Sequence, residues 1–285
     1  MDRSDSVGIL DSYFPDAAFF SEFERFDRHV EKLKRAGEEQ RIHYVSICSP
    51  NYLHDAHIRF ALRVHADAIC EKPLVMNPWN VEALAEIEQE TGHRINTIFQ
   101  LRLHPVIAGL RETIRKQPAG VIHDVDLTYI TGRGSWYLYS WKGSEEKSGG
   151  IAINIGIHFF DMLIWIFGGV RVNKLHLSEP TRAAGYLELE RARVRWFLSL
   201  DTHDLPAEVA QQGKRTFRSI RIDGKELEFS DGFTDLHTLS YREILEGRGF
   251  GLQEARASIE TAHTVRHAAL EPLKGDYHPW VKKRR

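Results

Sequence analysis

Short apolar runs alternate with amphipathic segments through the first hundred residues of the chain. The predicted strands cover 42–48, 68–70 and 94–99. Between them, apolar positions recur with helical spacing over about 54–64 and 78–91, and Gly92 ends the second of these helices. This strand–helix–strand–helix–strand order predicts a parallel sheet with crossover helices.

The pattern changes after about residue 117. Residues 121–131 alternate Val, Leu, Thr and Tyr as in a strand with one exposed face, and 151–167 form one apolar segment closed by Gly168-Gly169. Further strands are predicted at 172–178, 185–189, 194–200, 219–222 and 226–229, and further helices at about 236–246 and 252–273. Asp223-Gly224 predicts a hairpin between the last two strands.

These elements predict two domains of different class, α/β followed by α+β. We expect residues 1–118 to form a Rossmann-type dinucleotide-binding domain with a parallel sheet. Residues 119–285 are expected to form a substrate-binding and oligomerisation domain, with an open mixed sheet and helices.

The composition is that of an ordinary folded protein. The 285 residues are 42% hydrophobic and 27% charged, and the net charge of -2 gives no reason to expect nucleic acid or an anionic membrane as partner. Cys48 and Cys70 lie in apolar runs without a CxxC pair, so we expect two buried thiols in a reducing compartment. No signal-peptide core and no run of about 18 apolar residues occurs, so a cytoplasmic protein without a membrane span is predicted.

The tripeptide Glu71-Lys72-Pro73 follows the second predicted strand directly. Ligands of open α/β sheets bind outside the carboxyl ends of the strands. An ammonium there can hydrogen-bond a substrate hydroxyl and stabilise the oxygen as charge develops on it. Pro73 stiffens the loop and can adopt a cis bond. For an isolated tripeptide, an exposed Glu–Lys pair before a turn is the simpler interpretation.

The apolar segment 151–167 carries a polar stripe. Asn154, His158 and Asp161 fall within roughly 60° of one another on a helix. A helix this apolar is largely buried, so its polar stripe must face partners or a cavity. A histidine there can act as a general base, but a satisfied buried polar cluster explains the stripe equally well. No third ligand has convincing spacing for a metal site, so none is expected.

An arginine stands at the end of the third predicted strand. Arg102 lies in the segment 100–104, where a guanidinium can bind a carboxylate or phosphate with two hydrogen bonds. Arg133 and Tyr137, in the aromatic loop 132–150, can contribute to the same pocket.

Phosphate-binding loops are absent from the sequence. It contains neither GxGxxG nor GxxxxGK[ST], and no GxSxG elbow. The glycine-rich stretch 247–251 joins two predicted helices and is interpreted as a turn.

Two of these motifs together resemble the signatures of the Gfo/Idh/MocA oxidoreductase family. One signature is Glu-Lys-Pro, and the other is Gly-Gly followed by Asp-x-Gly-x-His-x-x-Asp, which matches residues 149–161 here with Asn154 in the place of the first Asp. The resemblance extends to about Leu270. It implies an N-terminal Rossmann domain that binds NAD, Lys72 in contact with the reacting hydroxyl, and His158 as general base. Because Asn154 is neutral where many family members have an Asp, the resemblance implies that it hydrogen-bonds to the sugar or to His158 and does not act in a charge relay.

A narrower similarity lies within that family. The segments SICSPNYLH, ICEKPLV, NIGIHFFDML and SDGFTDLHT are similar to bacterial members that use NAD to oxidise the C3 hydroxyl of UDP-N-acetyl-D-glucosaminuronate. This similarity implies a UDP-sugar substrate and a 3-keto product that passes to a pyridoxal-phosphate aminotransferase. The pathway makes diacetamido-uronic acid sugars for lipopolysaccharide O-antigen. Family members are often dimers or tetramers, so a homo-oligomer is expected.

The resemblance and the strand-end positions together define the expected site. The expected substrate-binding residues are Arg102, Arg133, Tyr137, Asn154 and Asp161. The expected cofactor-binding residues are Asp2, Ser49, Asn51, His54, Glu71, Lys72 and Gln100. Asp2 is placed at the end of the second Rossmann strand, where an acidic residue binds the adenosine ribose hydroxyls.

That placement of Asp2 has a consequence for the start of the chain. The family has roughly thirty residues before this point, the length of the βαβ beginning that holds the phosphate loop. We therefore expect Met1 to be a misplaced start or the start of a truncated record, with a strand and a Gly-rich turn encoded upstream in frame.

Two other functions are compatible with the sequence. One is a dehydrogenase of the same family that acts on another sugar or sugar nucleotide. The other is a non-catalytic protein that binds a sugar nucleotide or regulates its use. The sequence also leaves open whether NADH is released in each turnover or reoxidised in place by a 2-oxoacid.

Overall fold

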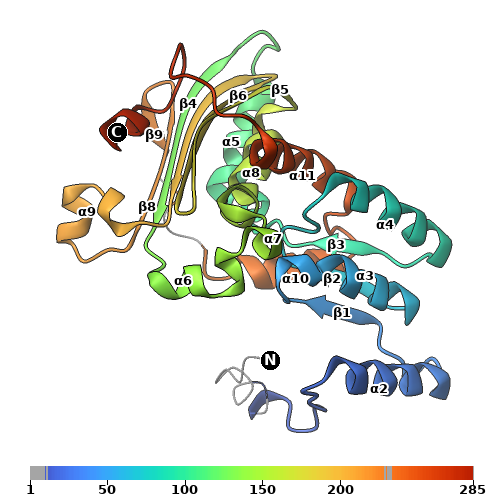
Figure 1. The fold of residues 1–285 in the computed structure, drawn as a ribbon. Coiled ribbons are helices and arrows are strands. Elements are labelled where there is room, and N and C mark those ends of the chain that lie inside the picture. Colours follow the sequence, from blue (N-terminus) through green and yellow to red (C-terminus); the bar gives the residue numbers. More distant parts are fainter. Residues whose placement is uncertain (1–9, 11, 228, 230–232, 285) are drawn as a thin grey trace.

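The computed structural model describes residues 10, 12–227, 229 and 233–284 and contains two β-sheets (Figure 1). The smaller sheet has the strand order β1-β2-β3, and the larger has the order β5-β6-β7-β4-β8-β9. The parallel sheet with crossover helices comes first, and the mixed sheet follows. The predicted fold class, α/β followed by α+β, is confirmed.

The smaller sheet is parallel throughout and is built as the apolar runs predict. Its strands are β1 (Tyr44–Ile47), β2 (Asp67–Cys70) and β3 (Ile95–Thr97), joined by the helices α3 (His54–Arg63) and α4 (Pro78–Thr91). Helix α4 begins with a proline, whose missing N–H costs nothing at a helix start, and ends on Gly92 in the left-handed region at φ 69°. Both crossover helices lie where the sequence predicts them.

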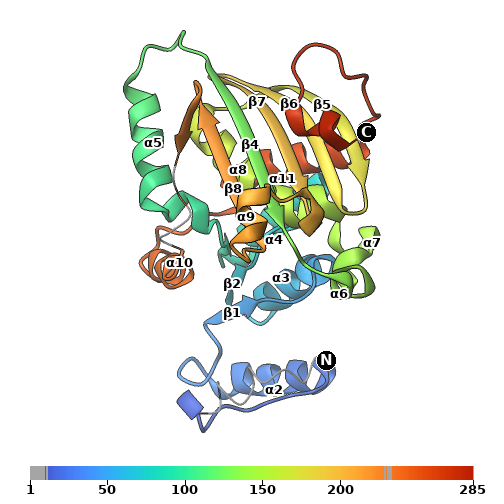
Figure 2. The same cartoon turned by 90° about the vertical axis from the view of Figure 1, so that its left-hand side faces the viewer.

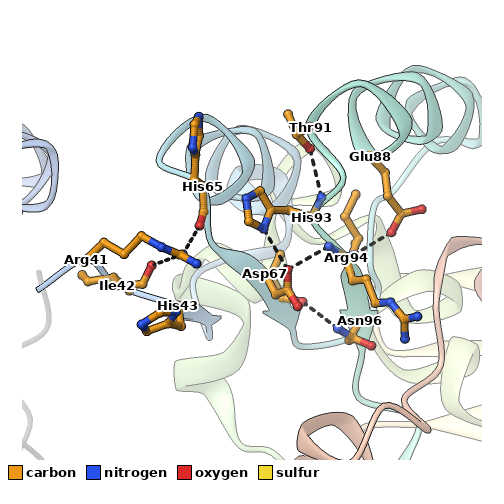
Figure 3. Close-up of polar contacts among 12 residues, drawn as sticks. Arg41, Ile42, His43, His65, Asp67, Glu88, Thr91, His93, Arg94 and Asn96 are labelled. Atoms are coloured by element: carbon orange, nitrogen blue, oxygen red, sulfur yellow. Dashed lines mark hydrogen bonds and ion pairs between the residues drawn. The ribbon is translucent and has the colours of Figure 1, made fainter. Parts of the chain in front are cut away.

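Polar side chains fix the amino-terminal ends of these strands (Figure 3). Asp67, the first residue of β2, accepts hydrogen bonds from the Arg94 backbone N–H at 2.9 Å and from His93 Nδ1 at 3.2 Å. The carboxylate of Glu88 on α4 accepts the N–H of Ile95 at 2.7 Å. These contacts set the start of β3 against β2, so that the two strands end together at the opposite edge.

Besides the short helices described below, the longer helices α2 (Phe23–Ala36) and α5 (Pro105–Lys116) were not predicted from the sequence. Helix α2 buries only Val30, and α5 buries only Ile107 and Ile114. Both helices are amphipathic, so their apolar spacing is present in the sequence, but their apolar residues are sparse among charged ones and the sequence interpretation missed them.

The larger sheet combines parallel and antiparallel pairs. Its strands are β4 (His123–Thr131), β5 (Val170–Glu179), β6 (Arg182–Leu189), β7 (Ala192–Ser199), β8 (Thr216–Ile222) and β9 (Lys225–Leu227). Strand β4 pairs in parallel with β7 and antiparallel with β8. Asp223 and Gly224, both at positive φ, make the tight turn between β8 and β9, so the predicted hairpin is confirmed.

One face of the larger sheet is covered by helices (Figure 2). Helix α8 (Ile157–Phe167), which continues the π-helical turn Ala152–Gly156, packs there together with α5 and α11 (Leu252–His267). The helical stretch Glu145–Phe167 is long and apolar enough to cross a membrane, but 78% of its most apolar window is buried inside the fold. It is therefore accounted for as a core helix.

The opposite face is partly covered by the C-terminal segment. Val281 and Trp280, in the 3-10 helix Pro279–Arg284, pack against Ile130 and Phe197 of the sheet. The loop between β4 and α8 holds the short helices α6 (Ser135–Tyr139), Trp141–Gly143 and α7 (Glu145–Ser148), and α9 (Ala207–Gln211) precedes β8.

The last helices return to the smaller sheet. Helix α10 (Leu236–Leu245) covers a face of that sheet through Ile244, which packs with Ile69 and Ile98. Phe250, just before α11, forms a bridge with Thr97 of β3. The division near residue 118 therefore separates the two sheets, while the final helices contribute to both. Cys70 is buried as predicted, but the prediction for Cys48 is wrong, because Cys48 is exposed at the end of β1.

Candidate active site

A cleft of about 830 Å³, measured with its open mouth, lies where the carboxyl ends of β2 and β3 meet the larger sheet and α8. Its lining residues are Lys72, Gln100, Leu101, Tyr129, Arg133, Tyr137, Lys142, Asn154, Ile155, His158, Phe159, Arg218, Phe229 and Phe233. Six of them are predicted site residues: Lys72, Gln100, Arg133, Tyr137, Asn154 and His158. Folding thus brings together residues from both domains.

Lys72 enters the cleft from the end of β2. Its ammonium donates one hydrogen bond, to the backbone oxygen of Asn154 at 3.0 Å. The Lys72–Pro73 peptide is cis. Burial lowers the pKa of Lys72 to about 8, and the neighbouring Lys142 and Arg133 act in the same direction against Glu71. An ammonium with one protein acceptor keeps two N–H groups for a ligand.

His158 faces the same cleft from α8. Its ring makes no hydrogen bond to any residue that the structure describes, although the helix around it is buried. Burial lowers the pKa of His158 well below its usual range, and the positive charges of Lys72 and Arg218 add to this effect. The ring is therefore neutral near pH 7 and free to accept a proton.

Asn154 is the centre of a buried amide chain. Its Nδ2 donates to the Tyr137 hydroxyl at 2.5 Å, and its Oδ1 accepts from Asn51 Nδ2 at 3.3 Å. Asn51 also donates to the backbone oxygen of Ser148 at 2.8 Å. Because the Tyr137 oxygen accepts from Asn154, its own proton is left for a group in the cleft.

The cleft is strongly cationic. Arg133, Lys142 and Arg218 surround the mouth, and none of them forms an ion pair within the described part of the chain. Arg218 stacks over the Phe233 ring at 4.4 Å, and Lys142 lies 5.4 Å from the centre of the Trp136 ring. No Asp or Glu is among the lining residues described, so these charges are available to an anionic ligand.

Gln100, which lines the cleft, and two further predicted residues lie at the strand ends. Gln100 Oε1 is a buried acceptor that has no partner in the described structure. The Ser49 hydroxyl contacts His57 Nδ1 at 2.9 Å, and the Glu71 carboxylate contacts His237 Nε2 at 3.2 Å. Their cofactor contacts remain predictions.

Arg102 and Asp161, both expected to bind substrate, bind each other in the described structure, and their role toward the substrate remains a prediction. The Arg102 guanidinium donates to both Asp161 oxygens, at 2.9 and 2.6 Å, and to the Glu254 backbone oxygen at 2.9 Å. It is enclosed by the rings of Phe99 and Phe250, and neither member of the pair lines the cleft. Burial raises the pKa of Asp161 while Arg102 opposes that shift. The pair is a buried salt bridge between a residue of the first predicted domain and a residue of the second.

Two residues expected to bind the cofactor are buried in the described structure, and their cofactor contacts remain predictions. His54 is 1% exposed, and its two ring nitrogens lie against the backbone oxygens of Pro73 and Ser49. Asn51 is 5% exposed and holds Asn154. Neither lines the cleft. In the described structure both side chains hydrogen-bond to neighbouring groups of the protein beside the cleft. Asp2 lies outside the described residues.

Sequence reasoning missed Lys142 and Arg218 as cleft residues. For Arg218 a signal exists, because it shares the alternation of Ile220 and Ile222, which face the helix-covered core of the sheet. A charged residue in an apolar register of a strand indicates a cavity or a partner. Lys142 carries no comparable signal. Among the described residues no cluster of three His, Cys, Asp or Glu side chains is arranged to hold a metal ion.

Comparison with known families matches both parts of the chain. Residues 1–99 match the Gfo/Idh/MocA description "Oxidoreductase family, NAD-binding Rossmann fold", and residues 111–204 match "Oxidoreductase family, C-terminal alpha/beta domain". The chain belongs to the Gfo/Idh/MocA oxidoreductase family.

One relative is similar over nearly the whole chain. It is the WlbA (WbpB) dehydrogenase from Thermus thermophilus, 50% identical in sequence, with a TM-score of 0.93 over 98% of this chain and 89% of that one. One crystal structure of that enzyme contains NAD and alpha-ketoglutarate, and another contains NAD and UDP-GlcNAcA.

The curated relatives match over shorter stretches. The D-glucoside 3-dehydrogenase of Escherichia coli K12 is 29% identical over 126 residues, which is 44% of this chain and 35% of that protein. The putative oxidoreductase YteT of Bacillus subtilis is 26% identical over 157 residues, or 54% and 36% of the two chains. The matched part thus spans about a third of each curated relative.

Proposed function

We propose that this protein is an NAD-dependent dehydrogenase that oxidises the C3 hydroxyl of UDP-N-acetyl-D-glucosaminuronate to the 3-keto sugar. The observation that carries the proposal is His158, which has no hydrogen-bond partner among the described residues, beside Lys72 in a cleft whose other described charged residues are cationic. The relative crystallised with NAD and UDP-GlcNAcA supports the choice of substrate.

The roles of the two central residues follow from their protonation states. His158, neutral near pH 7, takes the proton of the C3 hydroxyl as general base. Lys72, charged below about pH 8, donates a hydrogen bond to the same oxygen and stabilises its developing negative charge. The Tyr137 proton, free because Asn154 occupies the oxygen, orients a second sugar hydroxyl.

The surrounding charges match the proposed substrate. A UDP-uronate carries negative charge on its diphosphate and its sugar carboxylate. Arg133, Lys142 and Arg218 supply three positive charges around the cleft besides Lys72. Charge-assisted hydrogen bonds of this kind favour a uronate over a neutral sugar.

The strand ends fit the nicotinamide part of NAD, which accepts the hydride when it is bound. Gln100 Oε1, a buried acceptor that lacks a partner in the described structure, fits the amide N–H of a carboxamide. Ser49 and Glu71 lie on the neighbouring strand-end loops and remain the proposed cofactor contacts.

The direct test is turnover with NAD and substrate carrying deuterium at C3. We expect the NADH absorbance band to appear, the sugar to lose two hydrogens, and the deuterium to be found in NADH. Lys72→Ala and His158→Ala are expected to abolish all three signals while UDP-sugar binding by calorimetry persists. Deuterium retained in the sugar product would exclude oxidation at C3.

The same assay distinguishes the alternatives. Turnover of UDP-N-acetylglucosamine, but not of its uronate, would identify a dehydrogenase for another sugar nucleotide. Binding of the UDP-sugar without any reduction of NAD would identify a non-catalytic binding or regulatory protein.

A 2-oxoacid is a candidate second substrate. The Thermus thermophilus relative was crystallised with NAD and alpha-ketoglutarate, and the cationic cleft suits a dicarboxylate. With NADH bound, its hydride would reduce the keto carbon and the proton held by His158 would pass to the keto oxygen, which gives 2-hydroxyglutarate and NAD and returns His158 to its neutral form. Appearance of 2-hydroxyglutarate during turnover with substoichiometric NAD tests this step.

The setting of the reaction belongs to the same proposal. The 3-keto sugar is a substrate for a pyridoxal-phosphate aminotransferase, and the pathway leads to lipopolysaccharide O-antigen sugars. We place the protein in the cytoplasm as a homo-oligomer, a dimer or a tetramer. Conversion of the product by an aminotransferase tests the proposed next step. Light scattering of the purified protein tests the oligomeric state.

A further inference from the structure

His54 is a buried titratable group that the proposed chemistry does not use. It is the first residue of α3 and is 1% exposed. Its Nδ1 lies 2.7 Å from the Pro73 oxygen, and its Nε2 lies 2.8 Å from the Ser49 oxygen. Pro73 follows Lys72 in the chain, and Ser49 belongs to the loop after β1. One imidazole therefore links the carboxyl ends of two neighbouring strands.

The two contacts cannot be equal in a neutral ring. Backbone oxygens only accept hydrogen bonds, and a neutral imidazole has one N–H. Burial lowers the pKa of His54, and the two carbonyl contacts and Glu71 oppose that shift. The charged and titratable groups that face the ring are Glu71, Lys72 and the neighbouring His57. The single N–H of the neutral ring can therefore donate a hydrogen bond to only one of the two backbone oxygens.

We propose that His54 is a positioning residue for Lys72, acting through a hydrogen bond from its Nδ1 to the Pro73 oxygen. Both contacts are within hydrogen-bond distance, but only Pro73 is covalently next to Lys72, so only this contact can act directly on the residue that carries the ammonium. The bond fixes the segment from which Lys72 reaches its acceptor, the Asn154 oxygen, 3.0 Å away on the other domain. A displacement of about 1 Å at a catalytic group costs roughly 10²-fold in rate.

This inference rests on the dehydrogenase activity proposed above, so its test has one readout that needs no activity. Selective ¹⁵N labelling of histidine in the wild-type protein reports which ring nitrogen carries the proton, and the signal is assigned by its loss in a His54 variant. We expect an Nδ1–H tautomer near pH 7. An Nε2–H tautomer would overturn the proposal even if no substrate is ever turned over.

Two substitutions separate the two contacts. In His54→Asn the amide N–H₂ can occupy the Nδ1 position, and in His54→Gln it can occupy the Nε2 position. We expect H54N to keep kcat within about threefold, and H54Q to lose roughly 10²-fold in kcat with little change in the KM for the UDP-sugar. The alkaline limb of the kcat profile, set by Lys72, is expected to move in H54Q only.

His57→Asn provides the matched control. His57 lies on the same helix and contacts the Ser49 side chain, but it touches neither backbone oxygen. Any effect of this variant is expected in the KM for NAD, through Ser49, while kcat at saturating NAD and the pH profile stay as in the wild type. Equal losses in H54N and H54Q, or wild-type kcat in H54Q, would show that His54 only fills space. If both variants fail to fold, the tautomer measured in the wild type decides.

Discussion

At the scale of single residues, two basic groups in one cleft are driven to different protonation states. Burial lowers the pKa of Lys72 to about 8 and that of His158 well below its usual range. Near pH 7 Lys72 is therefore charged and His158 is neutral. Catalysis by a donor and an acceptor on one oxygen needs that combination.

The first prediction is the pH dependence that follows. Activity is expected to be level near pH 7 and to fall as pH rises through about 8, because Lys72 loses its proton there. In Lys72→Arg this limb should vanish, because a guanidinium does not titrate in that range. The measurement is kcat/KM against pH for both proteins. A limb that persists unchanged in K72R would assign it to another group.

The lowered pKa also carries a stability prediction. The folded-state pKa of Lys72 lies below the unfolded value of 10.5, so the buried ammonium destabilises the fold below about pH 8, and stability is gained as pH rises towards 10.5. Lys72→Met is expected to abolish turnover and to raise the free energy of unfolding at pH 7 by about 1–3 kcal/mol. Urea unfolding at pH 7 and pH 10 measures it, and the gain should shrink at the higher pH.

A further prediction concerns the cations at the mouth. Arg133 lies close enough to Lys72 and His158 to lower the pKa of both, so we expect it to bind the carboxylate of the sugar that reacts between them. Arg133→Met should cut kcat/KM roughly 10–100-fold for the uronate and much less for UDP-N-acetylglucosamine. Arg218→Met should lower kcat/KM for both UDP-sugars by the same factor, as expected for a contact with the diphosphate that both contain.

The control for this pair is Arg221→Met. Arg221 is on the same strand as Arg218 but on the opposite face of the sheet, and it is exposed. A loss of activity in R221M comparable to that in R133M would mean that total charge, rather than position, governs binding.

Single residues also show where sequence reasoning succeeds. Lys72 lies at a predicted strand end and His158 on a helical stripe of period 3.6, and the resemblance to family signatures assigned their roles. The substrate role of Arg102 stays a prediction, because a side chain at a strand end can also bind a residue of the other domain. Only the fold shows that the partner of Arg102 is Asp161, 59 residues away.

At the scale of elements, the salt bridge between Arg102 and Asp161 joins the segment after β3 to α8. Asp161 is 2% exposed and Arg102 is 6% exposed. Removing one member leaves the other charge buried without a partner. Asp161→Asn is expected to lower the free energy of unfolding by about 3–5 kcal/mol. The double variant R102M/D161L should recover part of this loss, because no buried charge remains.

Urea unfolding of the three proteins measures this coupling, and Glu31→Gln on α2 serves as control. Glu31 pairs with Arg35 at the surface at 3.2 Å, and an exposed pair of this kind contributes less than about 1 kcal/mol. If D161N were as stable as wild type but unable to bind UDP-sugar, the predicted role of Asp161 in the substrate site would be supported.

The elements differ in how well their sequences predict them. Strands β1 and β2 were found because of their apolar runs, β4 because of its alternation, and α3 and α4 because of their spacing and the stop at Gly92. Helices α2 and α5 were missed although they are amphipathic, because their apolar residues are sparse among charged ones. The C-terminal helix was predicted to run to residue 273 but ends at His267, since the chain then turns to pair Leu270 with Leu175 of β5.

At the scale of the whole molecule, one hydrophobic core joins the two sheets. The same buried cluster contains Cys70 and Ile95 of the smaller sheet and Trp196 and Leu198 of the larger one. Ile259 of α11 belongs to it as well, on a helix that contacts α4, β3, α8 and β5. Sequence patterns predicted the two sheets but not this joint core, because nothing local indicates that the last helices return to the first domain.

The last prediction follows from that shared core: the two sheets unfold as one unit. Ile259→Ala is expected to lower the free energy of unfolding by about 2–5 kcal/mol and to reduce amide protection equally at Ile69 in β2 and Leu198 in β7. Val30 of α2 belongs to a separate cluster, so Val30→Ala should reduce protection in α2 while leaving Leu198 unchanged. Native-state hydrogen exchange measures both variants. Loss of protection at Ile69 alone in I259A would show two independent units, and the buried Arg102–Asp161 salt bridge would then be too weak to couple the sheets.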